Sequence, residues 1–177
     1  MLDDVQIRIL PSLGEREIRE LGDVLMDCVD GGASVSFMHP MNRAKADTFW
    51  QGVAASVARG ERIVIVAEDK AGVIIGTVQI ILNLPENQPH RGDIAKMLVH
   101  RRARRRGIAA KLLAAAEPAA LDAGKTLLVL DTVTGADAER LYARHGWQRC
   151  GEIPDYGLWP DGRFCSVTLF YKALGKG

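Results

Sequence analysis

The sequence predicts an α/β (α+β) protein with one mixed, mostly antiparallel sheet of six to seven strands, flanked by helices on both faces. Three features support this prediction: antiparallel strands come first, a strand–helix–strand unit follows, and two strands end the chain. No linker, repeat or low-complexity segment interrupts the 177 residues. We therefore expect a single domain over residues 1–177, long enough to bury a substantial core.

The first third of the chain predicts one strand and two helices. Residues 5–10 alternate between apolar and polar side chains, as a half-buried strand does. Ser12 and Glu15 have capping-box spacing and predict the start of a helix, which a Gly-Gly pair ends. Asn42 predicts the cap of a second helix, which runs to about Arg59.

The rest of the chain predicts the remaining strands and two more helices. Runs of β-branched and apolar residues between turn residues predict the strands. In order, these are Arg62–Glu68, Val73–Leu84, Asp93–Val99, Thr126–Thr132, Trp147–Ile153 and Ser166–Lys172, with residues 154–163 linking the last two. The helices are expected from Gly107 to about Ala123 and over Asp137–His145, and a glycine follows each of them.

Composition argues against several classes of protein. The 23 basic and 22 acidic residues nearly cancel, so no overall field favours nucleic acid as a partner. No apolar run approaches the ~18 residues of a membrane span. Cys28, Cys150 and Cys165 are widely spaced and odd in number, so we expect reduced thiols and a cytoplasmic protein. No Cys-x-x-Cys or paired-histidine pattern occurs, and no metal site is expected.

The segment from Met97 to Leu113 has the order of an anion site. An apolar strand ends at Val99, five arginines follow within residues 101–106, and Gly107 precedes an Ala/Leu-rich helix. The first N–H groups of a helix have no partner within it, and the helix dipole favours negative charge there. Gly107 has no Cβ, so a ligand can approach the main chain closely. The alternative interpretations are a solvated surface loop and an RNA-binding patch.

Two motifs resemble those of the GNAT acetyltransferase superfamily. The spacing Arg104-x-x-Gly107-x-Ala109 is similar to its Arg/Gln-x-x-Gly-x-Gly/Ala signature. Residues 131–147 are similar to its second motif, with matches at Ala138, Leu141, Tyr142 and Gly146 and with Gly135 in place of the usual asparagine. The element order over residues 60–172 also agrees with the family. The resemblance implies the GNAT fold and acetyl-CoA (coenzyme A) as co-substrate.

The resemblance also implies where acetyl-CoA binds. Main-chain groups at the end of the third central strand would pair with the pantetheine arm, as an added strand does. N–H groups at the start of the following helix would hold the pyrophosphate, with arginine side chains adding contacts. The residues expected to contact acetyl-CoA are Met97, Leu98, Val99, Arg104, Arg105, Arg106, Gly107, Ile108, Ala109, Ala110 and Ala138.

Three residues are candidates for catalysis. Asp93 lies on the same side of its strand as Val99, and many relatives carry a catalytic glutamate at this offset. Asp131 ends an apolar strand, where apolar surroundings favour a general base. Either aspartate is expected to take the proton of the amine, Asp93 directly or through one water. The alternatives are that it bonds a main-chain N–H or anchors the ammonium group of the substrate. Tyr142 occupies the family's general-acid position, or else is a core residue that fixes its helix.

The acceptor site is expected between two loops. Gly32 and Ser34 lie where relatives form one wall of it. Asp161 and Arg163 are candidates for the other wall, where they would meet an ammonium and a carboxylate, unless they form an ordinary Pro-Asp-Gly turn. The resemblance implies a small-molecule amine as acceptor. Further similarity, including Lys96–Val99, to acetyltransferases of amino-acid-like toxins points to toxin or antibiotic resistance.

Two other functions stay open at this point. One is acetylation of a protein N-terminus or lysine. The other is a non-catalytic acyl-CoA-binding sensor, which the replacement of asparagine by Gly135 keeps open. We expect no nucleic acid and no membrane as partner, and either a monomer or a homodimer.

Overall fold

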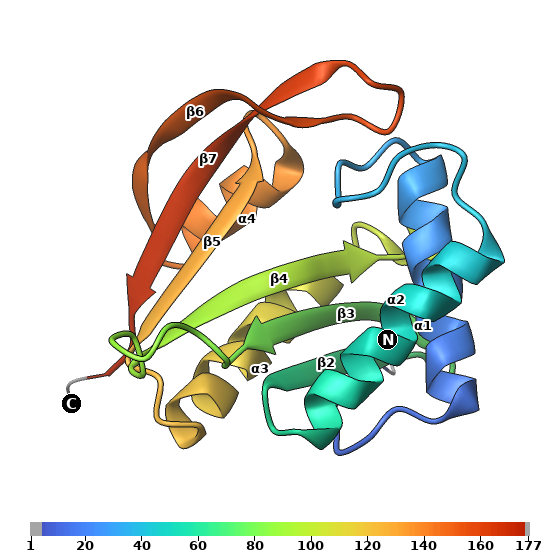
Figure 1. The fold of residues 1–177 in the computed structure, drawn as a ribbon, viewed down its shortest axis with the longest axis horizontal. Coiled ribbons are helices and arrows are strands. Elements are labelled where there is room, and N and C mark those ends of the chain that lie inside the picture. Colours follow the sequence, from blue (N-terminus) through green and yellow to red (C-terminus); the bar gives the residue numbers. More distant parts are fainter. Residues whose placement is uncertain (1–4, 176–177) are drawn as a thin grey trace.

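Seven strands form one sheet in the order β1-β2-β3-β4-β5-β7-β6 in the computed structural model, which describes residues 5–175 (Figure 1). All neighbouring strands are antiparallel except β4 and β5, which confirms the predicted mixed α/β sheet. The strands are β1 (Gln6–Leu10), β2 (Arg62–Glu68), β3 (Ile74–Ile81), β4 (Arg91–Val99), β5 (Leu127–Val133), β6 (Gln148–Leu158) and β7 (Phe164–Ala173).

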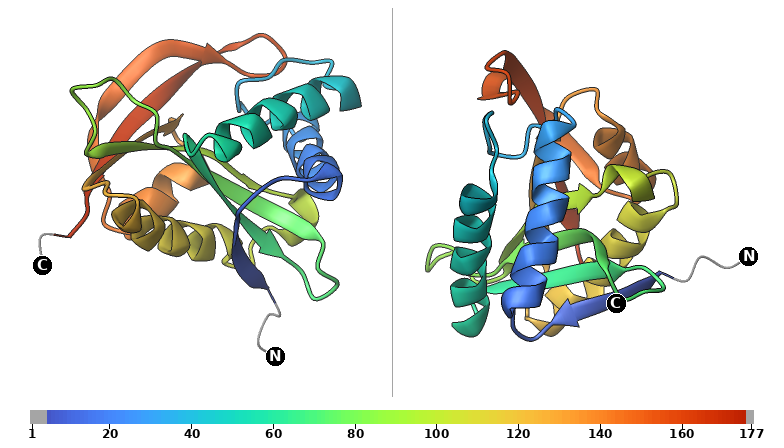
Figure 2. Two further views of the ribbon diagram at one scale, coloured as in Figure 1. Left: turned by 60° about the horizontal axis from the view of Figure 1, so that its bottom comes forward. Right: turned by 90° about the vertical axis from the view of Figure 1, so that its right-hand side faces the viewer.

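Helices cover both faces of this sheet, with α1 and α2 on one face and α3 on the other (Figure 2). They are α1 (Glu15–Asp30), α2 (Arg43–Ala58), α3 (Ile108–Asp122) and α4 (Asp137–Arg144). The alternation along β2 explains this arrangement, because Val64 and Val66 pack with α1 and α2 whereas Ile65 and Ala67 pack with α3. Within residues 5–175, none of the helices combines the length and apolar character needed to cross a membrane.

The two halves of the sheet separate between β4 and β5. These parallel strands pair only at their starts, where Arg91–Asp93 lie beside Leu127–Val129. Beyond Asp93 they diverge, as Figure 1 shows. The main-chain groups of β4 from residue 94 onward therefore have no strand partner on the β5 side.

A bulge interrupts β4 close to its end. One residue of β3, Val78, stands opposite two residues of β4, Lys96 and Met97. Lys96 has a φ of 51°, a left-handed conformation that is uncommon for a residue other than glycine. A bulge of this kind bends the strand and redirects the neighbouring side chains, and such bulges occur often beside functional sites.

The start of the first helix differs from the prediction, and that of the second agrees. α1 is capped at Gly14, whose N–H donates to Glu17 Oε2 at 3.0 Å, so the predicted capping box at Ser12 was wrong. The cap shifts because Leu13 is buried against the same cluster that Ile18 joins, a hydrophobic staple across the helix start. Asn42 caps α2 as predicted, with Oδ1 accepting from Lys45 N at 2.9 Å.

The final hairpin is longer than predicted. β6 continues through Pro154 to Leu158, a stretch that the sequence assigned to a linker. The register of β6 against β7 shifts between Ile153 and Gly157, and Asp155 has a φ of 53°. A proline is tolerated in a strand at such a bulge and on an edge strand, because no N–H is needed for the ladder there.

The α3 side of the core gives a test of the fold. Leu112 is fully buried in α3, whereas Leu121 on the same helix is 41% exposed. We expect Leu112→Ala to lower the free energy of unfolding by about 2–5 kcal/mol through loss of apolar contacts and a residual cavity. Leu121→Ala is the matched control and is expected to cost less than about 1 kcal/mol. Urea unfolding measures both, and equal losses would contradict the packing described.

Candidate active site

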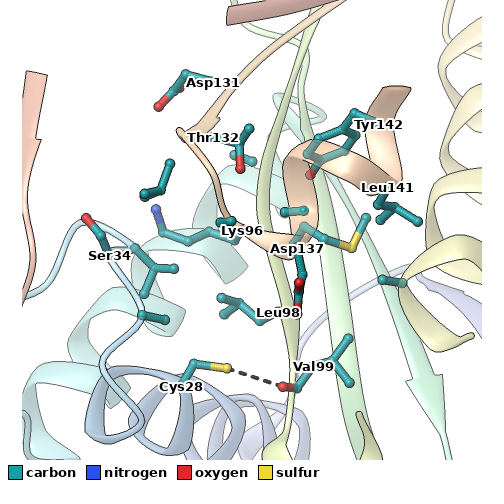
Figure 3. Close-up of a pocket in the computed structure, with 18 of the residues that line it drawn as sticks. Cys28, Ser34, Lys96, Leu98, Val99, Asp131, Thr132, Asp137, Leu141 and Tyr142 are labelled. Atoms are coloured by element: carbon teal, nitrogen blue, oxygen red, sulfur yellow. Dashed lines mark hydrogen bonds between the residues drawn. The ribbon is translucent and has the colours of Figure 1, made fainter. Parts of the chain in front are cut away.

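A cavity of about 1150 Å³ opens where β4 and β5 diverge (Figure 3). Its walls come from the loop after α1, the end of β4, the start of α3, the end of β5, α4 and the tip of β6. The segments that line it are 33–38, 94–99, 103–105, 107–110, 131–133, 136–138, 140–142 and 156–159, together with Cys28, Arg144 and Val167. Segments far apart in the sequence therefore share one pocket.

The start of α3 forms one end of this cavity. Gly107 and Arg105 have φ values of 71° and 60°, so the chain turns sharply just before the helix. Lys111 N donates to Gly107 O at 3.1 Å, which leaves the N–H groups of residues 108–110 without partners within the helix. No protein atom lies within 4 Å of a Cβ placed on Gly107. This turn has both the donors and the space that an anion needs.

The arginines before α3 divide between two tasks. Arg101 and Arg102 hold the turn to the rest of the protein, through Arg101 Nε to Asp27 Oδ1 at 2.9 Å and Arg102 Nη2 to Asp69 Oδ2 at 3.7 Å. Arg104 and Arg105 line the cavity. Arg106, also expected to contact acetyl-CoA, is exposed and lies outside the lining residues.

The end of β4 forms the floor of the cavity, as the placement of Met97, Leu98 and Val99 shows. Leu98 is 2% exposed because its side chain packs against α1 and α2. The Val99 carbonyl accepts from Arg104 Nε at 3.2 Å and from Cys28 Sγ at 3.6 Å. These bonds fix the end of β4 relative to α1 and to the turn at Arg105–Gly107 before α3, which we call the anion turn.

Tyr142 lies on α4 with its hydroxyl pointing into the cavity (Figure 3). Its ring packs against Trp147 and Phe170, with centroids 5.7 and 6.0 Å away, and only 4% of the residue is exposed. Among residues 5–175 the hydroxyl has no hydrogen-bond partner. Burial, and secondarily the charge of Asp131, raise the pKa of Tyr142, so the phenol stays protonated at neutral pH.

The two candidate aspartates are placed differently. Asp131 lines the cavity and is exposed, not enclosed by apolar residues as expected. Asp93 lies outside the lining residues, where the pairing of β4 with β5 ends. Its Oδ2 is 3.4 Å from Arg91 Nη2, and its Oδ1 is buried without a partner. Burial raises the pKa of Asp93, with the charge of Arg91 opposing and that of Asp131 adding to the rise.

The expected acceptor residues divide in the same way. Ser34 lines the cavity and donates to Leu158 O at 2.6 Å, which ties the loop after α1 to the tip of β6. Gly32 lies at the end of α1, outside the lining residues, with a φ of 87°. Asp161 and Arg163 also lie outside and pair with each other, with Arg163 Nη2 2.8 Å from Asp161 Oδ2 in the hairpin turn.

Sequence reasoning missed Lys96 as a residue of this site. Its Nζ donates to Ser36 Oγ at 3.0 Å and lies 5.6 Å from the centroid of the Phe49 ring. Burial, reinforced by the charge of Arg62, lowers the pKa of Lys96, and Asp131 opposes this. The signal in the sequence was a lysine within the otherwise apolar run from Ile94 to Val99.

Gly135 owes its identity to the backbone conformation. It has a φ of 79°, and its N–H donates to Glu139 Oε2 at 2.5 Å. Asparagine is one of the few other residues that adopt the left-handed region readily. Glycine here therefore preserves the turn that precedes α4. Ala138, in the first helical turn of α4, lines the cavity.

The residues from 5 to 175 contain no cluster of three or more His, Cys, Asp or Glu side chains that could hold a metal ion.

Comparison with known sequences identifies one family. A sequence model described as "Acetyltransferase (GNAT) family" matches residues 26–147, more than half of the chain. A curated relative from Azospirillum brasilense, described as an uncharacterized N-acetyltransferase in the hisH-hisA intergenic region, is 29% identical over 132 residues. That alignment covers 73% of this chain and 76% of the relative.

Solved acetyltransferases share the fold. A ribosomal-protein-alanine N-acetyltransferase from Brucella melitensis has a TM-score of 0.80 at 22% identity, over 96% of this chain and 99% of that one. A phosphinothricin acetyltransferase from Sinorhizobium meliloti, solved in complex with acetyl-CoA, has a TM-score of 0.79 at 17% identity, over 98% and 90% of the two chains. At these identities the likeness is one of fold.

The turn before α4 can be tested by substitution at Gly135. Gly135→Asn is expected to leave stability nearly unchanged, because asparagine adopts a positive φ and no atom lies within 4 Å of the added Cβ. Gly135→Val is expected to lower the free energy of unfolding by about 1–2 kcal/mol, because a β-branched residue is strained in this conformation. Chemical unfolding compares the two variants, and an equal effect would show that the conformation is not the constraint.

Proposed function

The chain belongs to the acetyltransferase (GNAT) family, and we propose that it transfers an acetyl group from acetyl-CoA to the primary amine of a small molecule. One observation carries this proposal. The open anion turn at Gly107 and the hydroxyl of Tyr142 belong to the same cavity. A cofactor anchored by its phosphates at one end can therefore present its thioester to side chains at the other.

The residues at the start of α3 fit the phosphates of acetyl-CoA. Free N–H groups, the helix dipole and the open space at Gly107 suit a pyrophosphate. Arg104 and Arg105 add positive charge and hydrogen-bond donors at the same end of the cavity. Arg106 is exposed beside this turn and is assigned to the phosphates as well.

The free edge of β4 fits the pantetheine arm. β5 does not pair with β4 beyond Asp93, so main-chain groups on that side, apart from the Val99 carbonyl that Arg104 and Cys28 already bond, are available for an extended ligand with amide groups. Met97 to Val99 lie along this edge, and Ala138 on α4 lines the same cavity. An arm bound there would lie between β4 and α4, where Tyr142 is buried.

The acceptor amine has to lose a proton before it attacks, because a free amine is mostly protonated at neutral pH. We assign this step to Asp131, the carboxylate that lines the cavity. Asp93 is assigned the onward passage of the proton through water. Its buried Oδ1 lacks a partner, and its raised pKa favours holding a proton.

Tyr142 is assigned to the leaving group. Bound acetyl-CoA supplies an activated thioester, from which the sulfur departs as a thiolate when the amine bonds to the acetyl carbon. The raised pKa keeps the Tyr142 hydroxyl protonated, so it can donate a hydrogen bond to the developing thiolate, and we assign it as the general acid, with the raised pKa favouring this hydrogen bond over early loss of the proton. The packing of its ring against Trp147 and Phe170 fixes the direction of the hydroxyl.

Contacts between two loops beside the cavity support a small acceptor. Ser34 donates to Leu158 O at the tip of β6, and His39 N donates to Pro160 O at 3.0 Å, so the loop after α1 and the β6–β7 hairpin are held together where Ser34 and Leu158 line the cavity. The chain also resembles the tabtoxin resistance protein at Lys96–Val99 and Pro160–Arg163. An amino-acid-like toxin or antibiotic is therefore the acceptor class we propose, with the reaction in the cytoplasm, where the free thiols of Cys28 and Cys165 stay reduced.

Turnover tests the proposal directly. Thiol release from acetyl-CoA, measured with a panel of small amines and with peptides bearing a free N-terminus or lysine, is expected for small amines only. Tyr142→Phe is expected to lower kcat at least about tenfold through loss of the proton donor. The affinity for acetyl-CoA and the unfolding free energy are expected to stay within about 1 kcal/mol, because the hydroxyl has no protein partner. Release only with peptides would favour the protein acceptor, and no release despite binding would favour a sensor.

The anion turn gives a test with a matched control on the same helix. Gly107 and Gly124 flank α3, have φ values of 71° and 77°, and have no atom within 4 Å of an added Cβ. Valine at either position is expected to cost about 1–2 kcal/mol of stability through backbone strain. Only Gly107→Val is expected to weaken acetyl-CoA binding, at least about tenfold, because its side chain fills the phosphate position. Calorimetric titration of both variants measures this, and equal affinities would place the pyrophosphate elsewhere.

A further inference from the structure

We propose that Lys96 and Ser36 form a carboxylate-binding subsite in the part of the cavity that binds the acceptor, which we call the acceptor half. The acceptor molecule then carries a carboxylate as well as the amine that is acetylated. This inference rests on the proposed function and narrows its acceptor. It starts from the one lysine among the residues that line the cavity.

The bulge in β4 directs Lys96 into the cavity. At this bulge Lys96 and Met97 both stand opposite Val78, and Lys96 has a left-handed φ of 51°. The side chain of Lys96 therefore departs from the regular alternation of the strand. In Figure 3 the side chain extends toward the part of the cavity where Ser34 and Asp131 are drawn, and Tyr142 lies on the other side. The ammonium group therefore belongs to the acceptor half of the cavity.

No carboxylate among residues 5–175 bonds the ammonium group directly, and Asp131 acts on it only through its charge. An ammonium has three donors, and within residues 5–175 the only acceptor bonded to Nζ is the neutral Ser36 Oγ at 3.0 Å. The ring of Phe49, at 5.6 Å, contacts it on one side. A cation that is partly removed from water is costly without an anion or several acceptors. Lys96 is thus prepared for an anionic group that the protein does not supply.

Two other lysines show what a structural role looks like in this fold. Lys125 is buried and donates to two carbonyls, Leu82 O at 3.2 Å and Pro89 O at 2.7 Å. Lys172 donates to Glu117 Oε1 at 2.7 Å and to His145 O at 2.8 Å. Each has at least two strong acceptors from the protein. Lys96 has one hydroxyl, so a purely structural role does not account for it.

The surroundings of Lys96 contain an excess of donors. Arg62 adds positive charge, which acts together with burial to lower the pKa of Lys96. The strand register places Gln79 beside Ala95, the residue before Lys96, and buried Gln79 Nε2 and Arg62 Nε both lack acceptors. A bound carboxylate would complement this field and offset the lowered pKa of the lysine.

Asp131 supplies the negative charge that the ammonium end of the same acceptor needs. It lines the cavity, and its charge acts on Lys96. An acceptor with a carboxylate at Lys96 and an ammonium toward Asp131 would satisfy both groups. Amino acids and their analogues have this combination, whereas diamines and other amines without a carboxylate leave Lys96 without a bonded anion.

The experiment compares each of the twenty amino acids with its own α-amide, which keeps the amine and removes the carboxylate. Thiol release from saturating acetyl-CoA is measured for the parent protein, for Lys96→Met and for Lys96→Arg. The parent is expected to favour the acids at least about tenfold in kcat/KM, mainly through KM. Lys96→Met is expected to abolish this preference without impairing the amides, and Lys96→Arg to keep part of it. Lys70→Met, in the exposed turn between β2 and β3, is the control and is expected to change neither series.

A second measurement needs neither turnover nor a variant. Reductive methylation of the parent protein, saturated with coenzyme A, is followed at Lys96 by mass spectrometry in the presence of acetate or acetamide. Acetate is expected to slow labelling of Lys96 but not of Lys70, and acetamide to slow neither. Equal labelling of Lys96 under both conditions would overturn the subsite.

The outcomes separate the two proposals. If acids and amides react equally, or if Lys96→Met reacts like the parent with both, the subsite is wrong and the acetyltransferase assignment stands. If no amine is acetylated, the proposed acceptor class fails, and protection by acetate decides the subsite alone. If acetyl-CoA instead adds an acetyl group to Lys96 itself, seen as a mass increase on that residue, its amine is an acceptor and the carboxylate subsite is overturned.

Discussion

The short pairing between β4 and β5 is the constraint on which the rest of the structure depends. The two strands run side by side only over Arg91–Asp93 and Leu127–Val129, and then separate. A continuous parallel ladder would bond the main-chain groups of β4 to β5 and leave no room between them. Because the ladder ends at Asp93, β4 keeps a free edge, and the cavity forms against it. The same divergence leaves space for α4 to bring Tyr142 to the site.

Groups of both charges line this cavity. Main-chain donors and arginines lie at the start of α3, the uncharged Tyr142 lies on α4, and Asp131 and Lys96 lie on β5 and β4. Asp131 acts on the groups around it, since its charge raises the pKa of Asp93 and Tyr142 and opposes the lowering of the pKa of Lys96. One exposed carboxylate thus influences each group to which we assign proton transfer or acceptor recognition.

Sequence predictions that depended on neighbouring residues were correct, whereas two that tertiary contacts could override were wrong. The Asn42 cap and the start of a helix after Gly107 were predicted correctly, because a cap and a strand–turn–helix pattern depend on neighbouring residues. The Ser12 cap was wrong, because burial of Leu13 against the core moved the helix start. The linker predicted after Ile153 was wrong because pairing with β7 carries β6 through a bulge at Pro154. In both errors, tertiary contacts overrode a reasonable local pattern.

The sequence by itself determined the class of fold and the strand–turn–helix order around Gly107, because these follow from periodicity and short spacings, whereas Tyr142 was singled out by the family resemblance. Only the tertiary structure decided which residues meet. It set Asp131 in the cavity and left Asp93 outside the lining residues, paired Asp161 with Arg163 in a turn, and placed Lys96 among the residues that line the cavity. Strand register, the bulge in β4 and the separation of β4 from β5 control these placements, and they arise from contacts between residues distant in the chain.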